Sequence, residues 1–369
     1  MSLAERDERM MQAALRLARR GLYSSDPNPR VGCVIARHDR IVGRGWHRRA
    51  GEAHAEVHAL AEAGDLARGA DCYVTLEPCD HHGRTPPCSA ALVAAGIRRL
   101  VIAAADPHRR AAGGAERLAA AGIEVVSGVL AAGSRALNIG FFSRHERHRP
   151  WVRLKLAISL DGRTAAANGQ SQWLTGEAAR ADVQRWRARA SAILTGGATV
   201  RADNPRLDVR LGRNPRQPLR LILSRQGDLD PAARIFAPPG RVVVYLTAAD
   251  TAPALAATPI EVRRLPGNAA DPTAQLTALL HQLAADEINE LHVEAGATLS
   301  GLWLGADLVD ELIVYLAPVL LGDRARPLAR LPGLERFADR RHWRLHDHRR
   351  CGDDIRLIFR RPEAPCSAA

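Results

Sequence analysis

The chain has 369 residues, of which 46% are hydrophobic, and a formal net charge of +12. A chain of this length is too long for one typical domain core, so we expect two domains. Six cysteines are too few for a fold held by disulfides, and no apolar run is long enough to span a membrane. The charge comes from 51 arginines and a single lysine spread along the chain, a pattern that indicates nucleic acid only weakly and also suits small phosphorylated substrates. The charged N-terminal segment lacks the apolar core of a signal peptide, so we expect a cytoplasmic protein with neither a membrane nor a nucleic acid as partner.

The first half of the chain alternates helical and strand patterns. The expected elements are, in order, a helix at 5–20, strands at 31–35 and 41–43, a helix at 54–63, a strand at 72–76, a helix at 88–95, a strand at 100–103, a helix at 115–121 and a strand at 123–126. This alternation predicts a sheet covered by helices. His54 and Cys88 begin two of the helices, which places both residues, with Cys79, at one end of that sheet.

These three residues have the spacing of a zinc site. One imidazole and two thiolates are a ligand set of a catalytic zinc that keeps its fourth position for water. Glu56 is the non-ligand acid and base that zinc deaminases need. Zinc makes hydroxide available at neutral pH, and Glu56 would carry a proton from water to the ring nitrogen and then to the departing ammonia. The pattern predicts hydrolytic deamination of an amino-substituted ring.

A structural zinc site is the alternative, because such a site takes four protein ligands. His81, His82 or Cys72 could supply the fourth one. We favour the catalytic site, because a His-x-Glu pattern beside two Pro-Cys pairs rarely arises by chance.

A basic stretch at residues 144–150 marks the expected boundary between domains at 1–147 and 148–369. Beyond it we expect strands at 151–158, 192–194, 219–223, 242–246, 288–293, 311–316 and 355–359, and helices at 177–190 and 273–285. These elements predict a mostly parallel sheet that ends in an antiparallel tail.

Two turns in the second half are candidate cofactor sites. Residues 294–301 join a strand to a helix, where backbone N–H groups could hold a pyrophosphate. Residues 194–205 place small side chains and a hydroxyl at the carboxyl end of a strand, where ligands bind in open sheets. Lys155 is the one lysine in a chain that otherwise uses arginine, and we expect it to serve this domain's site as a compact donor.

The segments Asp-Pro-Asn-Pro-Arg-Val-Gly at 26–32, Gly-Arg-Gly-Trp-His at 43–47 and the long loop between the two Pro-Cys pairs at 78–88 resemble the bifunctional deaminase–reductase family of bacterial riboflavin biosynthesis. The resemblance implies that the first domain deaminates a phosphoribosylamino-diaminopyrimidinone with one zinc. It implies zinc ligands at His54, Cys79 and Cys88, catalysis by Glu56, and a substrate pocket lined by Asn28, His47, His82, Gly83, Arg84 and Thr85. Asp80 stands where the family more often has a small polar residue.

The resemblance continues through segments 155–163, 171–173, 198–200 and 293–296. It implies a reductase domain that uses NADPH to open the ribose of the deaminated product. The implied NADPH contacts are Ala157, Trp173, Thr199, Asp203, Ser224, Gly296, Ala297, Thr298, Leu299, Ser300, Gly301 and Leu302. The substrate contacts, with Lys155 added from its own pattern, are Lys155, Ser171, Arg187, Leu207, Arg210 and Glu294, the two arginines being placed for the phosphate. Asp203 or Glu294 could assist protonation of the ribose oxygen.

The expected fold is therefore α/β, with an N-terminal cytidine-deaminase-like α/β/α domain followed by a dihydrofolate-reductase-like α/β domain, in a homo-oligomer. Two other functions stay open. A nucleic-acid deaminase with an accessory binding domain agrees with the zinc pattern and the positive charge, although aromatic residues for base stacking are only 4%. A zinc-stabilised scaffold without activity would unfold in its first half when the metal is lost.

Overall fold

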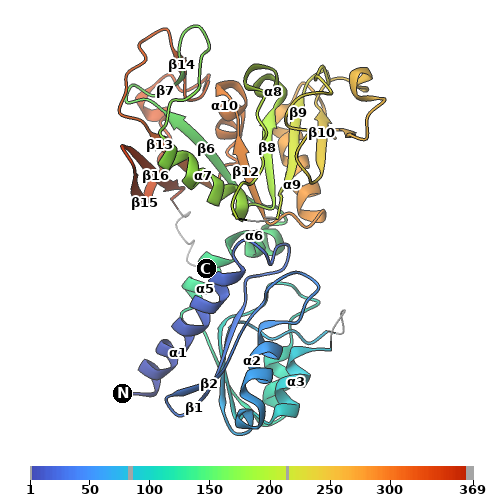
Figure 1. Ribbon diagram of the computed structural model, residues 1–369, viewed down its shortest axis with the longest axis vertical. Coiled ribbons are helices and arrows are strands. Elements are labelled where there is room, and N and C mark those ends of the chain that lie inside the picture. The colour runs from blue at the N-terminus through green and yellow to red at the C-terminus, as the bar shows by residue number, and fades with distance from the viewer. Residues whose placement is uncertain (1, 82–85, 213–215, 363–369) are drawn as a thin grey trace. The chain divides into compact units, whose positions relative to one another are not determined.

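The computed structural model describes residues 2–81, 86–212 and 216–362. The chain divides into two compact units, Met1–His148 and Arg149–Ala369, which are described one at a time (Figure 1). No helix among the described residues combines the length and the apolar character needed to cross a membrane.

The first unit is built on a five-stranded sheet with the order β2-β1-β3-β4-β5. Its elements are α1 (Leu3–Ala18), β1 (Gly32–Arg37), β2 (Arg40–Trp46), α2 (Ala55–Ala63), β3 (Asp71–Leu76), α3 (Cys88–Ala95), β4 (Arg99–Ala104), α4 (Gly114–Ala120), β5 (Glu124–Ser127), α5 (Ala131–Leu137) and α6 (Ile139–Arg147). β1 pairs antiparallel with both β2 and β3, whereas β3, β4 and β5 run parallel. The carboxyl ends of β3 and β4 therefore lie at the same edge of the sheet.

Helices cover both faces of this sheet, as Figure 1 shows for α1 on one side and α2 and α3 on the other. Ala59 of α2, Leu92 of α3 and Leu118 of α4 belong to one buried cluster. Met10 and Met11 of α1 pack into a second cluster against Val34 and Tyr73, whose side chains alternate with those of the first cluster along the strands. The predicted α/β/α arrangement is confirmed.

Small residues let α2 lie directly on the β1–β2 hairpin. A Cβ atom on Gly45 would stand 1.9 Å from the carbonyl oxygen of Ala55, and one on Gly43 would stand 2.2 Å from that of Ala59. No side chain fits in either place, so the backbones of β2 and α2 are in contact. This contact fixes the start of α2, which is where His54 and Glu56 lie.

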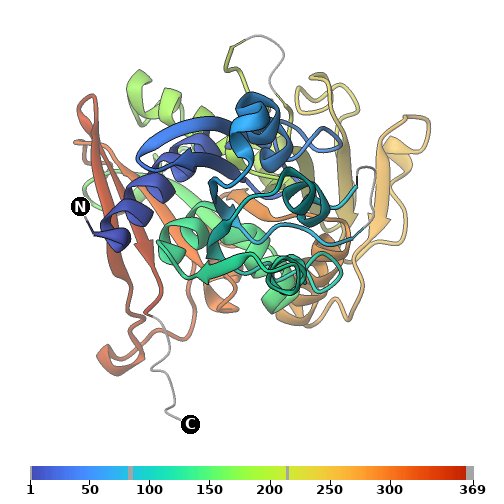
Figure 2. The ribbon, with the colours of Figure 1, turned by 90° about the horizontal axis from the view of Figure 1, so that it is seen from below.

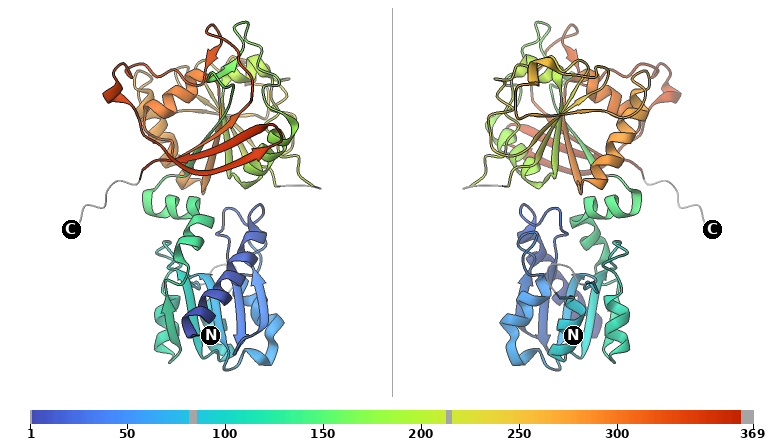
Figure 3. Two further views of the ribbon diagram at one scale, coloured as in Figure 1. Left: turned by 90° about the vertical axis from the view of Figure 1, so that its left-hand side faces the viewer. Right: turned by 90° about the vertical axis from the view of Figure 1, so that its right-hand side faces the viewer.

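The second unit contains a nine-stranded sheet with the order β11-β10-β9-β8-β12-β6-β13-β16-β15. Its elements are β6 (Trp151–Ile158), β7 (Arg163–Ala165), α7 (Glu177–Arg189), β8 (Ala192–Gly196), α8 (Gly197–Asp203), β9 (Leu219–Ser224), β10 (Val242–Leu246), β11 (Glu261–Arg264), α9 (Pro272–Ala285), β12 (Glu290–Glu294), α10 (Ala297–Gly305), β13 (Glu311–Leu316), β14 (Arg326–Pro327), β15 (Arg344–Cys351) and β16 (Asp354–Arg360). The strands from β11 to β13 are parallel, and β16 and β15 add antiparallel. The predicted parallel sheet with an antiparallel tail is confirmed, and Figures 2 and 3 show the tail as the red hairpin at one edge.

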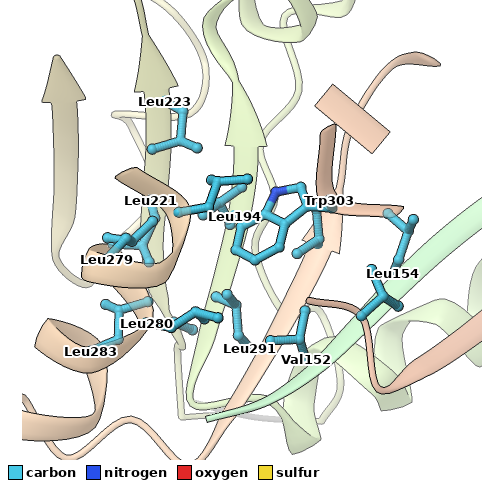
Figure 4. Packing of buried hydrophobic residues seen from close by; sticks show 14 of the residues in the cluster. Val152, Leu154, Leu194, Leu221, Leu223, Leu279, Leu280, Leu283, Leu291 and Trp303 are labelled. Carbon is cyan, nitrogen blue, oxygen red and sulfur yellow. The ribbon is translucent and has the colours of Figure 1, made fainter. Parts of the chain in front are cut away.

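The main core of this unit lies between the sheet and the helices α9 and α10. Trp303 of α10 is completely buried, and Figure 4 shows it among leucines of β8, β12 and α9. On the opposite face, Ala179 and Val183 of α7 pack against Ile313 and Tyr315 of β13. Each face of the sheet is thus covered by helix, as is usual where the strands are parallel.

Several short or exposed elements were not predicted. α5 lies before the basic stretch at 144–150, where we predicted the domain boundary, and α6 runs into it. β7, β11 and β14 are only two to four residues long. Every residue of β15 except Cys351 is exposed, so its sequence lacks the alternation that identifies a half-buried strand.

We predict that Gly45→Ala destabilises the first unit by about 1–3 kcal/mol, because the added methyl group must push α2 away from β2. Urea unfolding of the full chain measures this. Gly305→Ala is the control, since a Cβ atom there meets nothing within 4 Å. Equal stability of the Gly45 variant and the unchanged protein would show that the helix can shift freely.

Candidate active sites

Three elements bring the predicted zinc ligands to one edge of the first sheet. His54 is the N-terminal cap of α2, Cys88 is the first residue of α3, and Cys79 follows β3 by three residues. The start of a helix carries a partial positive charge, which suits a metal-bound thiolate at Cys88, although the hydrogen bond with Cys79 and burial raise the pKa of the Cys88 thiol. The fold thus assembles residues from three separate segments.

The three side chains converge on one point. The ligand atoms of His54, Cys79 and Cys88 all lie within 4.8 Å of one another. Nδ1 of His54 is 3.2 Å from the sulfur of Cys88 and 3.6 Å from that of Cys79. Hydrogen bonds from Cys88 and His54 lower the pKa of Cys79 to about 4, which makes its sulfur the readier thiolate of the pair. One imidazole nitrogen and two sulfurs at this separation fit a zinc ion.

A four-ligand structural site finds no support in the described residues. They place no fourth His, Cys, Asp or Glu ligand atom in the group. Cys72, one predicted alternative, lies in the core with its sulfur 3.5 Å from that of Cys33. His82 lies outside the described residues, as do Gly83, Arg84 and Thr85 of the predicted substrate loop. Among the described residues the site therefore has three ligands, the number with which a catalytic zinc keeps a position for water.

Glu56 lies on the first turn of α2 and is 3% exposed. Burial raises the pKa of its carboxyl group above the ordinary value, although the imidazole of His54 opposes this. Its Oε2 atom has no hydrogen-bond partner among the described residues. A buried carboxylate oxygen without a partner is costly, and a bound water or substrate N–H would satisfy it.

Asn28 and His47 lie together beside the zinc ligands. Nδ1 of His47 is 3.2 Å from the carbonyl oxygen of Ala53, so this nitrogen carries the proton. Nε2 then accepts the hydrogen bond from Nδ2 of Asn28, at 3.0 Å. The ring of His47 meets that of His54 edge-on, with centroids 5.3 Å apart. The amide of Asn28 is thereby held in one orientation near the metal site.

A cavity of about 980 Å³ opens at the carboxyl ends of the strands in the second unit. It is bounded by α8, by the end of β9 and by the start of α10. Most of the predicted NADPH contacts line it, namely Thr199, Asp203, Ser224, Gly296, Ala297, Thr298, Leu299 and Leu302. A Cβ atom on Gly197 would stand 3.0 Å from Oγ of Ser224, so glycine keeps this wall open. A cavity of this size beside a helix N-terminus fits a dinucleotide with its pyrophosphate.

Four predicted NADPH residues lie elsewhere in the described structure. Ser300 and Gly301 are buried inside α10. Ala157 of β6 packs in the cluster beneath α7, and the ring of Trp173 is 72% exposed with the guanidinium of Arg180 over it. None of the four is among the residues that line the cavity.

Glu294 is the centre of the predicted substrate residues. Arg187 of α7 donates two hydrogen bonds to it, at 2.6 and 2.9 Å, and Nζ of Lys155 is 4.0 Å from its Oε2. Burial alone would raise the pKa of Glu294, but the guanidinium of Arg187 holds it well below its ordinary value. Burial lowers the pKa of Lys155, whose side chain is 18% exposed.

The other predicted substrate residues connect to Glu294 or to the cofactor cavity through neighbouring residues. Arg210 binds the carboxylate of Asp208, and Arg187 donates to the backbone oxygen of the same residue. Leu207 is buried with a φ of 49°. Ser171 donates to Asp203 at 3.0 Å, which connects it to the cofactor cavity. The substrate and cofactor groups are therefore adjacent.

Two residues of this site were missed from the sequence. Asp208 pairs with both Arg206 and Arg210, so neither arginine lacks a carboxylate partner. His292 is completely buried, and its Nε2 atom is 3.5 Å from Glu294. The alternation of Glu290, His292 and Glu294 along β12 could have shown that these three side chains share one face.

Comparisons with known proteins match both units. Residues 4–104 match the cytidine and deoxycytidylate deaminase zinc-binding region, and residues 150–357 match the RibD C-terminal domain. The riboflavin biosynthesis protein RibD of Escherichia coli is 48% identical over 364 residues, covering 95% of this chain and 98% of that protein. The chain belongs to the RibD family. The RibD protein of Bacillus amyloliquefaciens is 40% identical and covers 95% of each chain.

Solved structures of the RibD family agree along the whole length. Acinetobacter baumannii RibD has a TM-score of 0.90 and 43% identity, covering 98% of this chain and all of that one. The diaminohydroxyphosphoribosylaminopyrimidine deaminase/5-amino-6-(5-phosphoribosylamino)uracil reductase of Thermotoga maritima has a TM-score of 0.88 and 32% identity, with the same coverage. Residues 150–357 match a RibD domain, so the second unit is not the accessory nucleic-acid-binding domain that the alternative function requires.

We predict that removing the metal with a chelator abolishes deamination while far-UV circular dichroism stays nearly unchanged. The reason is that backbone and side-chain hydrogen bonds, rather than zinc alone, hold the ligand-bearing segments. Adding zinc back should restore the activity. Loss of the helical signal on chelation would instead identify the zinc-stabilised scaffold.

Proposed function

We infer that the protein is the bifunctional deaminase–reductase of riboflavin biosynthesis. The first unit hydrolytically deaminates 2,5-diamino-6-(5-phosphoribosylamino)pyrimidin-4(3H)-one. The second unit reduces the ribose of the resulting 5-amino-6-(5-phosphoribosylamino)uracil to the ribitylamino compound. Zn²⁺ and NADPH are the cofactors. The observation that carries this function is the convergence of His54, Cys79 and Cys88 beside a buried Glu56 whose Oε2 atom has no partner among the described residues, in a chain whose remainder matches the reductase domain.

In the deaminase unit, His54, Cys79 and Cys88 would hold zinc, which supplies a Lewis acid able to make water acidic near neutral pH. Glu56 moves the protons in two transfers. Its free carboxylate oxygen accepts the first proton of the attacking water and gives it to the ring nitrogen, and it then carries the second proton, from the hydroxyl group added to the ring, to the leaving amine. Its burial supports this role, because a raised pKa makes the carboxyl group easier to protonate. Asn28, oriented by His47, would bind a polar edge of the pyrimidine.

In the reductase unit, NADPH would supply the hydride from the cavity at the strand ends. Lys155 and the Glu294–Arg187 pair would orient the ribose, and Arg210 would reach the phosphate. We propose that Arg187 mainly positions Glu294, since it donates two partly buried hydrogen bonds to that carboxylate. Asp203 or Glu294 could assist proton delivery to the ribose oxygen. Because the pKa of Glu294 is well below its ordinary value, Glu294 would assist as an ionised group that orients Lys155, and Lys155 would hold the proton.

We also propose that the protein works in the cytoplasm as a homo-oligomer. The described cysteines are all free thiols, in keeping with a reducing compartment. β15 is the outermost strand of its sheet and exposes nearly all its side chains, so its edge is open to a second copy of the chain. Sedimentation velocity measures the oligomeric state, and a monomer at micromolar concentration would contradict the proposal.

We predict that Glu56→Gln lowers the rate of ammonia release by a factor of about 10²–10⁴, because the amide cannot carry the proton. Ammonia assays with the diaminopyrimidinone substrate measure this loss. The same variant should retain bound zinc and should oxidise NADPH at the normal rate when given the deaminated compound. A deaminase rate close to normal would remove Glu56 from the mechanism.

We predict that Lys155→Arg lowers NADPH oxidation by roughly 10-fold or more, because the larger, planar guanidinium cannot take the place of a compact ammonium beside Glu294. Absorbance at about 340 nm, the band of reduced nicotinamide, follows the reaction. Ammonia release by the first unit serves as the internal control. Full reductase activity in this variant would show that any cation suffices at this position.

A further inference from the structure

We propose that Asp80, Ser89 and Arg117 are positioning residues that hold the two cysteine ligands together before metal arrives, and that they thereby set how slowly zinc leaves. This inference rests on the zinc site of the proposed function. None of the three side chains is itself a zinc ligand. They link the two segments that carry Cys79 and Cys88.

The segment around Cys79 is fastened to the start of α4. Oε1 of Glu77 accepts hydrogen bonds from the backbone N–H groups of Gly113 and Ala115, at 3.1 and 3.2 Å. A Cβ atom on Gly114 would stand 1.9 Å from the carbonyl oxygen of Pro78, so the two backbones touch there. Glu77 thus satisfies donors at the N-terminus of α4 that have no partner within the helix.

Asp80 then connects this segment to both α4 and α3. Its Oδ1 atom accepts a hydrogen bond from Arg117 of α4 at 2.9 Å and another from Oγ of Ser89 in α3 at 2.5 Å. Ser89 is completely buried. Its backbone N–H also donates to the carbonyl oxygen of Cys79, at 3.2 Å. One hydrogen bond therefore joins the two residues that follow the ligands, and a second joins Ser89 to Cys79 itself.

These bonds hold the two cysteines close together without metal. The backbone N–H of Cys88 also donates to the sulfur of Cys79, at 3.5 Å, between the same two segments that Ser89 and Asp80 join. Two thiolates repel each other, and the carboxylate of Asp80 adds a third negative charge nearby. The guanidinium of Arg117 offsets that charge. Groups that orient metal ligands in this way commonly contribute 10- to 100-fold to metal affinity.

Zinc release from the full-length protein tests the proposal. Zinc-loaded protein is mixed with an excess of a coloured chelator, and the rate of transfer is compared among Asp80→Ala, Ser89→Ala and Arg117→Ala. We expect release to be roughly 10- to 100-fold faster in the first two variants. Arg117→Ala should show a smaller acceleration that diminishes in high salt, because its contribution is a half-exposed charge. Ser89→Thr keeps the hydroxyl group and should restore slow release.

The matched control is Arg135→Ala, which removes a surface ion pair with Glu146 of similar exposure in the same unit. It should leave zinc release unchanged. Thermal unfolding of the metal-free variants separates positioning from simple stability: lowered stability with normal zinc release would overturn the proposal. Arg117 is half-exposed, so Arg117→Ala removes no core packing and should fold. This variant therefore tests the proposal even if Ser89→Ala, which changes a buried residue, does not fold. Failure of the unchanged protein to bind zinc would instead contradict the proposed function.

Discussion

The direction of the strands is the constraint on which both sites depend. Parallel strands place their carboxyl ends at one edge of a sheet, so residues that follow different strands become neighbours. In the first unit this edge holds Cys79 after β3. In the second unit it brings Glu294 at the end of β12 beside Lys155 of β6, and Ser224 at the end of β9 into the cavity with Gly196 of β8. An antiparallel order would have put half of these residues at the opposite edge.

Other residues of both sites lie at the starts of helices. His54 caps α2, Cys88 opens α3, and the turn at Gly296 opens α10. N–H groups without a partner inside the helix and a partial positive charge at these positions suit a thiolate and a pyrophosphate alike. The glycines of β2 complete the arrangement in the first unit, because they allow α2 to approach closely enough for Glu56 to be buried. Close backbone packing is thus a condition for the proton chemistry.

The sequence predicted those parts of the fold that have a local pattern. The zinc ligands, Glu56 and most of the long strands follow from spacing and periodicity, whereas β15 has no apolar alternation to reveal it. Contacts between distant segments could not be predicted, because they depend on the packed fold. The pairing of Arg187 with Glu294 joins residues 107 positions apart. The buried His292 could be assigned to this site only once its contact with Glu294 was seen. Asp80 was noticed as an unusual residue, but its bonds to Ser89 and Arg117 needed the structure.

The single lysine would give the proposed reductase site a chemical label of its own. Because all other basic side chains of the sequence are arginines or histidines, an acylating reagent has one side-chain amine to modify, apart from the terminal amino group. That amine lies beside Glu294 with a pKa lowered by burial, which leaves more of it in the nucleophilic, uncharged form. Protection of Lys155 from acylation would therefore report ligand occupancy of this site in the unaltered protein, without a substitution or an attached probe.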